Sequence, residues 1–151
     1  MQTLQIFVAD DEEIDRYIVQ RVAKKWPQAC EIYEFTCGEE LLDVVLDLEK
    51  LNNLLGDPNL PIIVLLDINM PRGNGFEVLE AVKRHHENGE AANLMMVLMF
   101  TSSDNPEDQA RARSFDFVKD YCTKPLTLED LDRIYDMHEE YQVKKPQAAS
   151  A

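Results

Sequence analysis

Polar side chains capable of chemistry follow the short apolar runs of this 151-residue sequence in a repeated way. These side chains are Asp10 and Asp11 after the first run, Asp67 after the third, Thr101 after the fourth and Lys124 after the fifth. A lone Asp in such a position usually caps a helix, and a lone Lys-Pro usually forms a turn. Caps and turns alone do not explain well why such a polar side chain follows the apolar run in four of the five repeated units. We therefore expect these groups to meet at one site.

The chemistry of such a site follows from its charges. Three clustered carboxylates repel one another and stay ionised only beside a positive charge. Oxygen ligands favour a hard cation, and magnesium suits a shallow site with few carboxylates and several waters. Lys124 offers a compact charge for a phosphoryl oxygen, and Thr101 offers a hydroxyl donor. A carboxylate nucleophile, a divalent ion and a lysine are the groups needed to form an aspartyl-phosphate.

The elements that must position these groups are strands alternating with helices. Ile62–Leu66 lies between Pro61 and Asp67, and its unbroken apolar character is typical of a strand buried on both faces. Four further strands are expected, at Leu4–Ala9, Cys30–Phe35, Leu94–Phe100 and Phe117–Cys122. Strand-helix alternation repeated five times predicts one α/β domain, a doubly wound parallel sheet with helices on both faces. Ligands of such sheets bind beyond the carboxyl ends of the strands.

Five helices are expected between and after these strands. Glu39–Leu55 is dense in Leu and Val and predicts one long helix. Three other helices have predicted caps, at Asn74 with Glu77, at Asn105 before Pro106, and at Thr127. The buried face expected for the first helix is Ile14, Ile18, Val22 and Trp26, and for the last helix Leu128, Leu131, Ile134 and Tyr135.

Composition limits the kinds of partner. The formal net charge of −14 disfavours broad contact with nucleic acid or with an anionic membrane surface. No apolar run approaches the roughly 20 residues of a membrane span, and the amino terminus lacks a secretion signal, so we expect a cytoplasmic protein. The three cysteines are read as reduced thiols. The domain is expected to cover residues 1–143, with a disordered tail over residues 144–151.

The pattern resembles the receiver domain of bacterial two-component response regulators, the CheY-like family, and its stand-alone single-domain type. The resemblance covers roughly Leu4 to Tyr141, and it rests on Asp10-Asp11-Glu12, Asp67-Ile-Asn-Met-Pro71 with Gly75, Thr101-Ser102 and Tyr121-Cys-Thr-Lys124-Pro125. It implies a five-stranded flavodoxin-like sheet with strand order 2-1-3-4-5.

The resemblance also implies a role for each matching residue. Asp67 would be the phosphoacceptor, with Asp11 as a direct ligand of Mg²⁺ and Asp10 as a direct or water-mediated one. Asn69 would contribute its backbone carbonyl to the metal. Thr101 would hydrogen-bond the phosphoryl group and Lys124 would pair with it. Thr101 and Tyr121 would form the switch, although Tyr121 is alternatively a half-buried edge residue with its hydroxyl in water.

The implied function is a binding module controlled by phosphorylation. A histidine kinase or phosphotransfer protein would donate the phosphoryl group, and the receiver would catalyse only its own phosphorylation and dephosphorylation. The output would be contact with a downstream protein target, and a homodimer is open. Two alternatives are a phosphatase-like enzyme with an aspartyl-phosphate intermediate and a structural adaptor that is not phosphorylated. The first usually has an acid two residues after the nucleophile, where this chain has Asn69.

Three departures from the family pattern stand out. Arg72-Gly73-Asn74 replaces a more usual apolar residue and Asp before Gly75, which suggests a more mobile loop beside Asp67. The region 39–60 and the connection 84–93 are longer than in a minimal receiver. Two interpretations of these longer segments are a surface that binds a partner protein and surface decoration without a function of its own.

Overall fold

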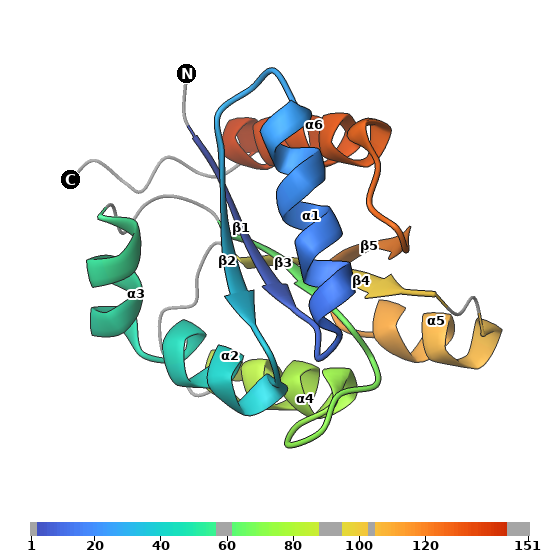
Figure 1. Ribbon diagram of the computed structural model, residues 1–151. Coiled ribbons are helices and arrows are strands. Elements are labelled where there is room, and N and C mark those ends of the chain that lie inside the picture. Colours follow the sequence, from blue (N-terminus) through green and yellow to red (C-terminus); the bar gives the residue numbers. More distant parts are fainter. Residues whose placement is uncertain (1–2, 57–61, 88–94, 103–104, 145–151) are drawn as a thin grey trace.

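A five-stranded parallel sheet forms the centre of the protein (Figure 1). The structure is a computed structural model that describes residues 3–56, 62–87, 95–102 and 105–144. The strands are β1 (Leu4–Ala9), β2 (Cys30–Phe35), β3 (Ile62–Leu66), β4 (Met95–Thr101) and β5 (Val118–Thr123). Their spatial order is β2-β1-β3-β4-β5 and every neighbouring pair is parallel, which confirms the predicted doubly wound fold and its strand order.

Burial along the strands follows their place in the sheet. Every residue of the three central strands β1, β3 and β4 is buried, as the unbroken apolar run at Ile62–Leu66 predicts. The edge strands β2 and β5 contain exposed and half-buried residues. Central strands are covered by helices on both faces, so apolar side chains are favoured at every position.

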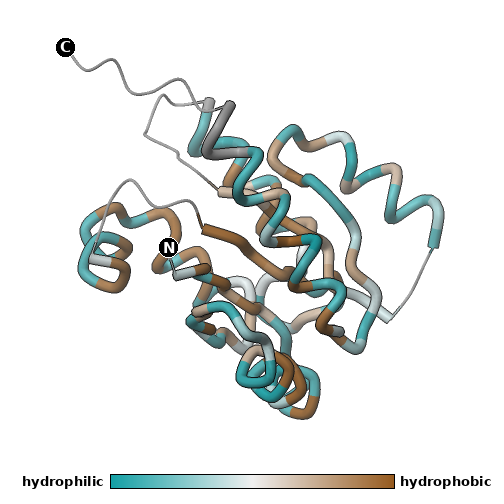
Figure 2. Tube along the Cα trace, turned by 90° about the horizontal axis from the view of Figure 1, so that it is seen from above, coloured by the Kyte–Doolittle hydropathy of each residue, from teal (hydrophilic) through white to brown (hydrophobic). Residues whose placement is uncertain are grey.

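The helices form one layer on each face of the sheet (Figure 1). They are α1 (Glu13–Lys25), α2 (Gly38–Val45), α3 (Leu48–Leu55), α4 (Gly75–Glu87), α5 (Pro106–Arg113) and α6 (Leu128–Lys144). Side chains of α1 and α6 share one hydrophobic cluster, and side chains of α2 to α5 share the other. Figure 2 shows hydrophobic residues concentrated along the strands and hydrophilic residues frequent on the outer helices.

The prediction of one long helix over Glu39–Leu55 is wrong, because the chain forms two helices there. Asp47 adopts extended dihedral angles between them, and its carboxylate accepts a hydrogen bond from the Lys50 N–H at 3.2 Å. A side-chain acceptor of this kind satisfies a free N–H and starts a new helix. Gly56, at φ 76°, then ends α3 in a left-handed conformation.

Two predicted helix faces need correction, whereas the predicted caps are confirmed. Ile14 is 61% exposed and Leu128 is 41% exposed, so neither belongs to the core. Both lie in the first turn of their helices, α1 and α6, and the buried side chains of these helices come from later turns. The caps make the expected bonds: Asn74 Oδ1 accepts from the Glu77 N–H, Asn105 Oδ1 from the Glu107 N–H and Thr127 Oγ1 from the Asp130 N–H.

The carboxyl-terminal boundary differs by one residue from the expectation. Lys144, the first residue of the predicted tail, is the last residue of α6. The rest of that tail, residues 145–151, and most of the connection 84–93 lie outside the described residues. Among the helices that the structure describes, none has the length and apolar character needed to cross a membrane.

Candidate functional site

The carboxyl ends of the strands are held in register by backbone hydrogen bonds. The Asp10 N–H donates to the Phe35 carbonyl at 3.0 Å, and the Asp67 N–H donates to the Ala9 carbonyl at 3.0 Å. At the other side of the sheet the Lys124 N–H donates to the Thr101 carbonyl at 2.9 Å. These bonds continue the strand pairing one residue past the strands, so the three functional side chains start from fixed backbone positions.

Three carboxylates meet at this rim, as the sequence predicts. Asp10, Asp11 and Asp67 each offer an oxygen atom, and these atoms lie within 4.8 Å of one another. Asp10 is fully buried and Asp67 is 6% exposed, whereas Asp11 is exposed to solvent. The acidic cluster is therefore partly buried and partly accessible to solvent.

Lys124 brings the positive charge to this cluster. Its Nζ lies 2.6 Å from Asp10 Oδ2, 2.9 Å from Asp15 Oδ2 and 3.6 Å from Asp67 Oδ2. Asp15, on the first turn of α1, was not among the predicted site residues. The ammonium is therefore shared among three carboxylates, and its contact with Asp67 is the longest of the three.

Burial governs the ionisation of the site. It raises the pKa of Asp67 to about 6, against an opposing effect of Lys124, and the Asp10 charge raises it further. Burial also raises the pKa of Asp10 in spite of the Lys124 contact. For Lys124, burial acts to lower the pKa, but the contacts with Asp10 and Asp15 outweigh it and the pKa is raised. One lysine does not fully compensate the clustered carboxylates.

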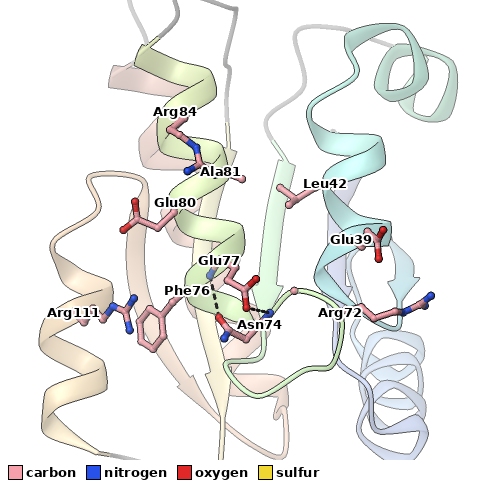
Figure 3. Close-up of a pocket in the computed structure, with 11 residues that line it drawn as sticks. Glu39, Leu42, Arg72, Asn74, Phe76, Glu77, Glu80, Ala81, Arg84 and Arg111 are labelled. Atoms are coloured by element: carbon pink, nitrogen blue, oxygen red, sulfur yellow. Dashed lines mark hydrogen bonds between the residues drawn. The ribbon is translucent and has the colours of Figure 1, made fainter.

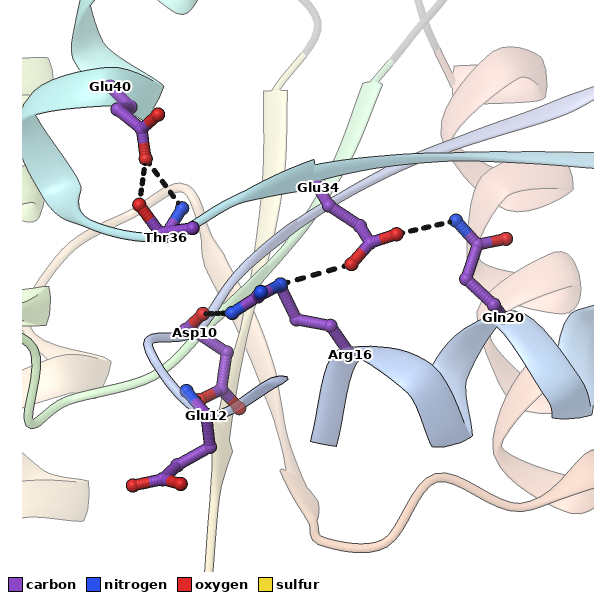
Figure 4. Close-up of polar contacts among 7 residues, drawn as sticks. All are labelled: Asp10, Glu12, Arg16, Gln20, Glu34, Thr36 and Glu40. Carbon is purple, nitrogen blue, oxygen red and sulfur yellow. Dashed lines mark hydrogen bonds and ion pairs between the residues drawn. The ribbon is translucent and has the colours of Figure 1, made fainter. Parts of the chain in front are cut away.

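Contacts from α1 and from Glu12, the residue before it, hold Asp10 in place (Figure 4). The Glu12 N–H donates to Asp10 Oδ1 at 2.9 Å, and Arg16 donates from a terminal guanidinium nitrogen to the Asp10 carbonyl at 2.7 Å. The Arg16 Nε also pairs with Glu34 of β2 at 3.0 Å. Arg16 thus ties the end of β1 to the neighbouring edge strand, a role that the sequence reading did not identify.

The chain turns sharply after Asp67. The Gly75 N–H donates to the Ile68 carbonyl at 2.8 Å, and a Cβ at Gly75 would lie 2.6 Å from the Asp67 carbonyl oxygen. A glycine is therefore required for α4 to start this close to the end of β3. Within the turn, the Asn69 backbone N–H donates to the Asp67 carboxylate, and the Asn69 side chain is exposed.

The loop over residues 71–74 is tied to the first turn of α2. The Gly38 N–H donates to the Gly73 carbonyl at 3.0 Å, and the Glu39 N–H donates to the Arg72 carbonyl at 3.1 Å. A Cβ at Gly38 would lie 2.3 Å from the Gly73 carbonyl oxygen. Arg72 has φ 48°, an unusual value for a residue with a side chain. These hydrogen bonds count against the expected mobility of the loop.

A groove of about 600 Å³ lies beside this loop, between α2, α4 and α5 (Figure 3). The Arg111 guanidinium lies 4.1 Å from the centroid of the Phe76 ring and covers one end of the groove. Glu39, Glu77 and Glu80 line the groove together with Arg72, Arg84 and Arg111. Such mixed charge selects neither an anionic nor a cationic ligand.

Thr101 and Tyr121 lie on adjacent strands at the same side of the site. Thr101 is the buried last residue of β4 and pairs in register with Thr123. Tyr121 packs against the core, and its hydroxyl is buried with no hydrogen-bond partner among the described residues. Burial raises the pKa of Tyr121. The alternative in which this hydroxyl lies in water therefore does not hold.

The remaining titratable candidates lie away from the rim. Burial raises the pKa of the Cys122 thiol to about 12, which favours an inert thiol. His86 packs edge-on against Phe117, with ring centroids 5.3 Å apart. His138 is buried in α6. None of these groups joins the acidic cluster.

The donor set fits a hard divalent cation. All three side chains offer oxygen atoms, and burial raises the pKa values of Asp10 and Asp67. Oxygen ligands and a partly open site are the features that magnesium requires. Asp10, Asp11 and Asp67 would hold such an ion.

Comparison with known proteins agrees with this geometry. The model of the response regulator receiver domain family matches residues 6–136. The chain is 38% identical over 86 residues to the probable methanogenesis regulatory protein FilR2 of Methanothrix harundinacea, covering 57% of the chain and 52% of that protein. It is 27% identical over 135 residues to hybrid signal transduction histidine kinase C of Dictyostelium discoideum, covering 86% of the chain and 10% of that protein.

A solved structure supports the same relationship. The crystal structure of a two component response regulator from Cytophaga hutchinsonii has a TM-score of 0.76 and 29% sequence identity, covering 93% of this chain and 99% of that one. The chain spans only 52% and 10% of the two curated relatives, so the similarity concerns part of each relative. The family model matches most of the sequence, and the structure has the acidic rim with its lysine. The chain therefore belongs to the response regulator receiver domain family of two-component signalling.

Proposed function

We propose that Asp67 accepts a phosphoryl group from a histidine kinase or phosphotransfer protein of the cytoplasm, in a Mg²⁺-dependent reaction. The observation that carries the proposal is the position of the buried Asp67 carboxylate, 3.6 Å from Lys124 Nζ and beside Asp10 and Asp11. A nucleophilic carboxylate, a compact cation and two further acidic ligands lie at one pocket. Phosphoryl transfer depends mainly on such positioning and charge stabilisation.

The transfer step requires an ionised Asp67. One carboxylate oxygen attacks phosphorus, the new O–P bond forms, and the N–P bond of the phosphohistidine breaks with its electron pair remaining on the imidazole. Lys124 and the Thr101 hydroxyl stabilise the phosphoryl oxygens. When bound by Asp10, Asp11, Asp67 and the Asn69 carbonyl, Mg²⁺ supplies neutralisation of negative charge. Hydrolysis later adds water to phosphorus, breaks the O–P bond and releases inorganic phosphate and the free carboxylate.

The output is a phosphorylation-dependent protein contact. Thr101 and Tyr121 respond to the phosphoryl group and shift the population of conformations at the face formed by α5, β5 and α6. A downstream protein that binds one of these conformations reads the signal. The chain itself catalyses only its own phosphorylation and dephosphorylation.

A phosphatase-like enzyme with an aspartyl-phosphate intermediate is less well supported. Such an enzyme needs an acid near the nucleophile to protonate the leaving group, and the residue two positions after Asp67 is Asn69. An adaptor that is not phosphorylated would have no need for the buried acidic pair Asp10 and Asp67 beside Lys124.

Intact-mass measurement with acetyl phosphate and Mg²⁺ tests the proposal. The wild-type protein should gain one phosphoryl group, and Asp67→Asn should gain none. Asp43→Asn, which neutralises an exposed carboxylate on α2, should behave like the wild type. Lys124→Ala should be phosphorylated but should show smaller NMR chemical-shift changes in α5, β5 and α6. Modification that persists in Asp67→Asn would refute the assignment of the phosphoacceptor.

A further inference from the structure

Asp15 takes part in the ion pairs of the site without belonging to its acidic cluster. Its Oδ2 accepts a hydrogen bond from Lys124 Nζ at 2.9 Å, across 109 positions of sequence. The carboxylates that could hold a cation are Asp10, Asp11 and Asp67. Asp15 therefore acts on the chemistry through the lysine.

The three distances at Lys124 indicate where its ammonium is held. Nζ lies nearer to Asp10 and Asp15, at 2.6 and 2.9 Å, than to Asp67, at 3.6 Å. The side chain of Lys124 is 10% exposed and that of Asp15 is 22% exposed, so solvent screens this pair only partly. An ammonium has three N–H donors, and carboxylates already occupy its shortest contacts.

We propose that Asp15 is a positioning residue that draws Lys124 toward α1 and competes with the phosphoryl group on Asp67 for its ammonium. This inference rests on the proposed function of Asp67. The phosphorylated Asp67 side chain would carry nearly two negative charges at neutral pH, whereas the free carboxylate carries one. Its oxygens must recruit a lysine that Asp15 already holds, and the Asp15 charge also repels them. Asp15 thus weakens the binding of a phosphoryl group at Asp67.

Beryllofluoride, a phosphoryl mimic, provides a binding measurement that does not depend on turnover. Its affinity in saturating Mg²⁺ can be titrated by fluorine NMR. Asp15→Asn should tighten binding about three- to tenfold, since it frees the lysine and removes a charge at short range. Asp15→Glu keeps the charge and should remain within about twofold of the wild type. Glu13→Gln removes an equal charge from an exposed position of the same helix turn and is the matched control.

The role of the lysine is tested in a second background. In Lys124→Ala, the further change Asp15→Asn should alter the affinity by less than about twofold, because the contested ammonium is absent. In the Mg²⁺-free protein, Asp15→Asn should also shift the NMR resonance of Lys124 Nζ, and Glu13→Gln should leave it in place.

The outcomes separate this inference from the proposed function. If wild-type protein binds beryllofluoride and Asp67→Asn does not, the phosphoacceptor assignment holds and the Asp15 variants decide the inference. Weaker binding by Asp15→Asn, or a change no larger than that of Glu13→Gln, would overturn it. Absence of binding by the wild type would overturn both.

Discussion

In this receiver, the interiors of the central strands differ sharply from the carboxyl ends of the same strands. Along β1, β3 and β4 every residue is buried and nearly all are apolar. One residue further, Asp10 and Asp67 are equally buried, yet they are carboxylates with raised pKa values. The strand interiors contribute to stability, whereas the burial of ionised carboxylates at the strand ends costs stability. Such an arrangement is characteristic of a functional site rather than of a core.

The largest expected effect comes from the strand interior. Leu65→Ala should lower the free energy of unfolding by about 2–5 kcal/mol, because Leu65 is fully buried and its truncation leaves a cavity. Urea denaturation followed by the fluorescence of the buried Trp26 measures this loss. Leu54→Ala, at a 40% exposed position on α3, is the matched control and should cost less than about 1 kcal/mol. Equal losses at both positions would contradict the described core.

The strand end should respond in the opposite direction. In the absence of divalent ions, Asp67→Asn should raise the free energy of unfolding at pH 7 by at most about 3 kcal/mol, since it removes a buried charge. The folded pKa of about 6 exceeds the ordinary value of 3.8, so the folded protein binds more protons between these values. Wild-type stability from this group is therefore present below pH 3.8 and is lost as the pH rises through about 6.

The titration of Asp67 also tests the cause of the stability gained in Asp67→Asn. The advantage of Asp67→Asn should vanish below about pH 4 and be complete above about pH 6. Urea denaturation at a series of pH values measures it. A constant advantage at all pH values would mean that the buried charge of Asp67 is not responsible.

Magnesium should offset part of the stability that the carboxylates at the strand ends cost, and so reduce their difference from the strand interiors. At a hundredfold excess over its dissociation constant, an ion that binds only the folded protein stabilises it by about 2.7 kcal/mol. Thermal unfolding of the wild type with and without Mg²⁺ should show this gain, and Asp11→Asn should lose most of it. Glu12→Gln, which alters the adjacent exposed acid, should keep it. A similar gain in Asp11→Asn would exclude Asp11 as a ligand.

The smallest expected change in stability lies outside both the strand interiors and the strand ends. Asp47→Ala should cost about 1 kcal/mol, because it removes the oxygen that caps α3. Asp47→Ser keeps a capping oxygen and should recover most of the loss in urea denaturation. Phosphorylation by acetyl phosphate should be equal in both variants. A change in phosphorylation would show that α3 influences the strand ends.

The sequence predicts the strand ends well because parallel topology is simple. When all carboxyl ends face the same way, residues such as Asp67 and Lys124 must approach one another whatever the loop lengths. The caps at Asn74, Asn105 and Thr127 were also predictable, since each depends on residues within three positions.

What escaped prediction depends on features that local patterns do not contain. Asp47 is compatible with a helix interior or with a cap, and only packing decides between them. A stripe of apolar residues at steps of four places Ile14 on a buried face, although its helix turn lies outside the hydrophobic cluster. The contact of Asp15 with Lys124 joins residues 109 positions apart through a helix rather than a strand end.

The paired backbone hydrogen bonds between Gly38 and Gly73, and between Glu39 and Arg72, have a mechanical consequence. Residues 71–74 lie four to seven positions after Asp67, and they cannot be displaced without either breaking both bonds or carrying the amino end of α2 with them. Gly38 permits this close approach, because a Cβ at that position would clash with the carbonyl oxygen of Gly73. Movement of residues 71–74 and tilting of α2 are thereby geometrically linked, on the side of the sheet opposite to α1 and α6.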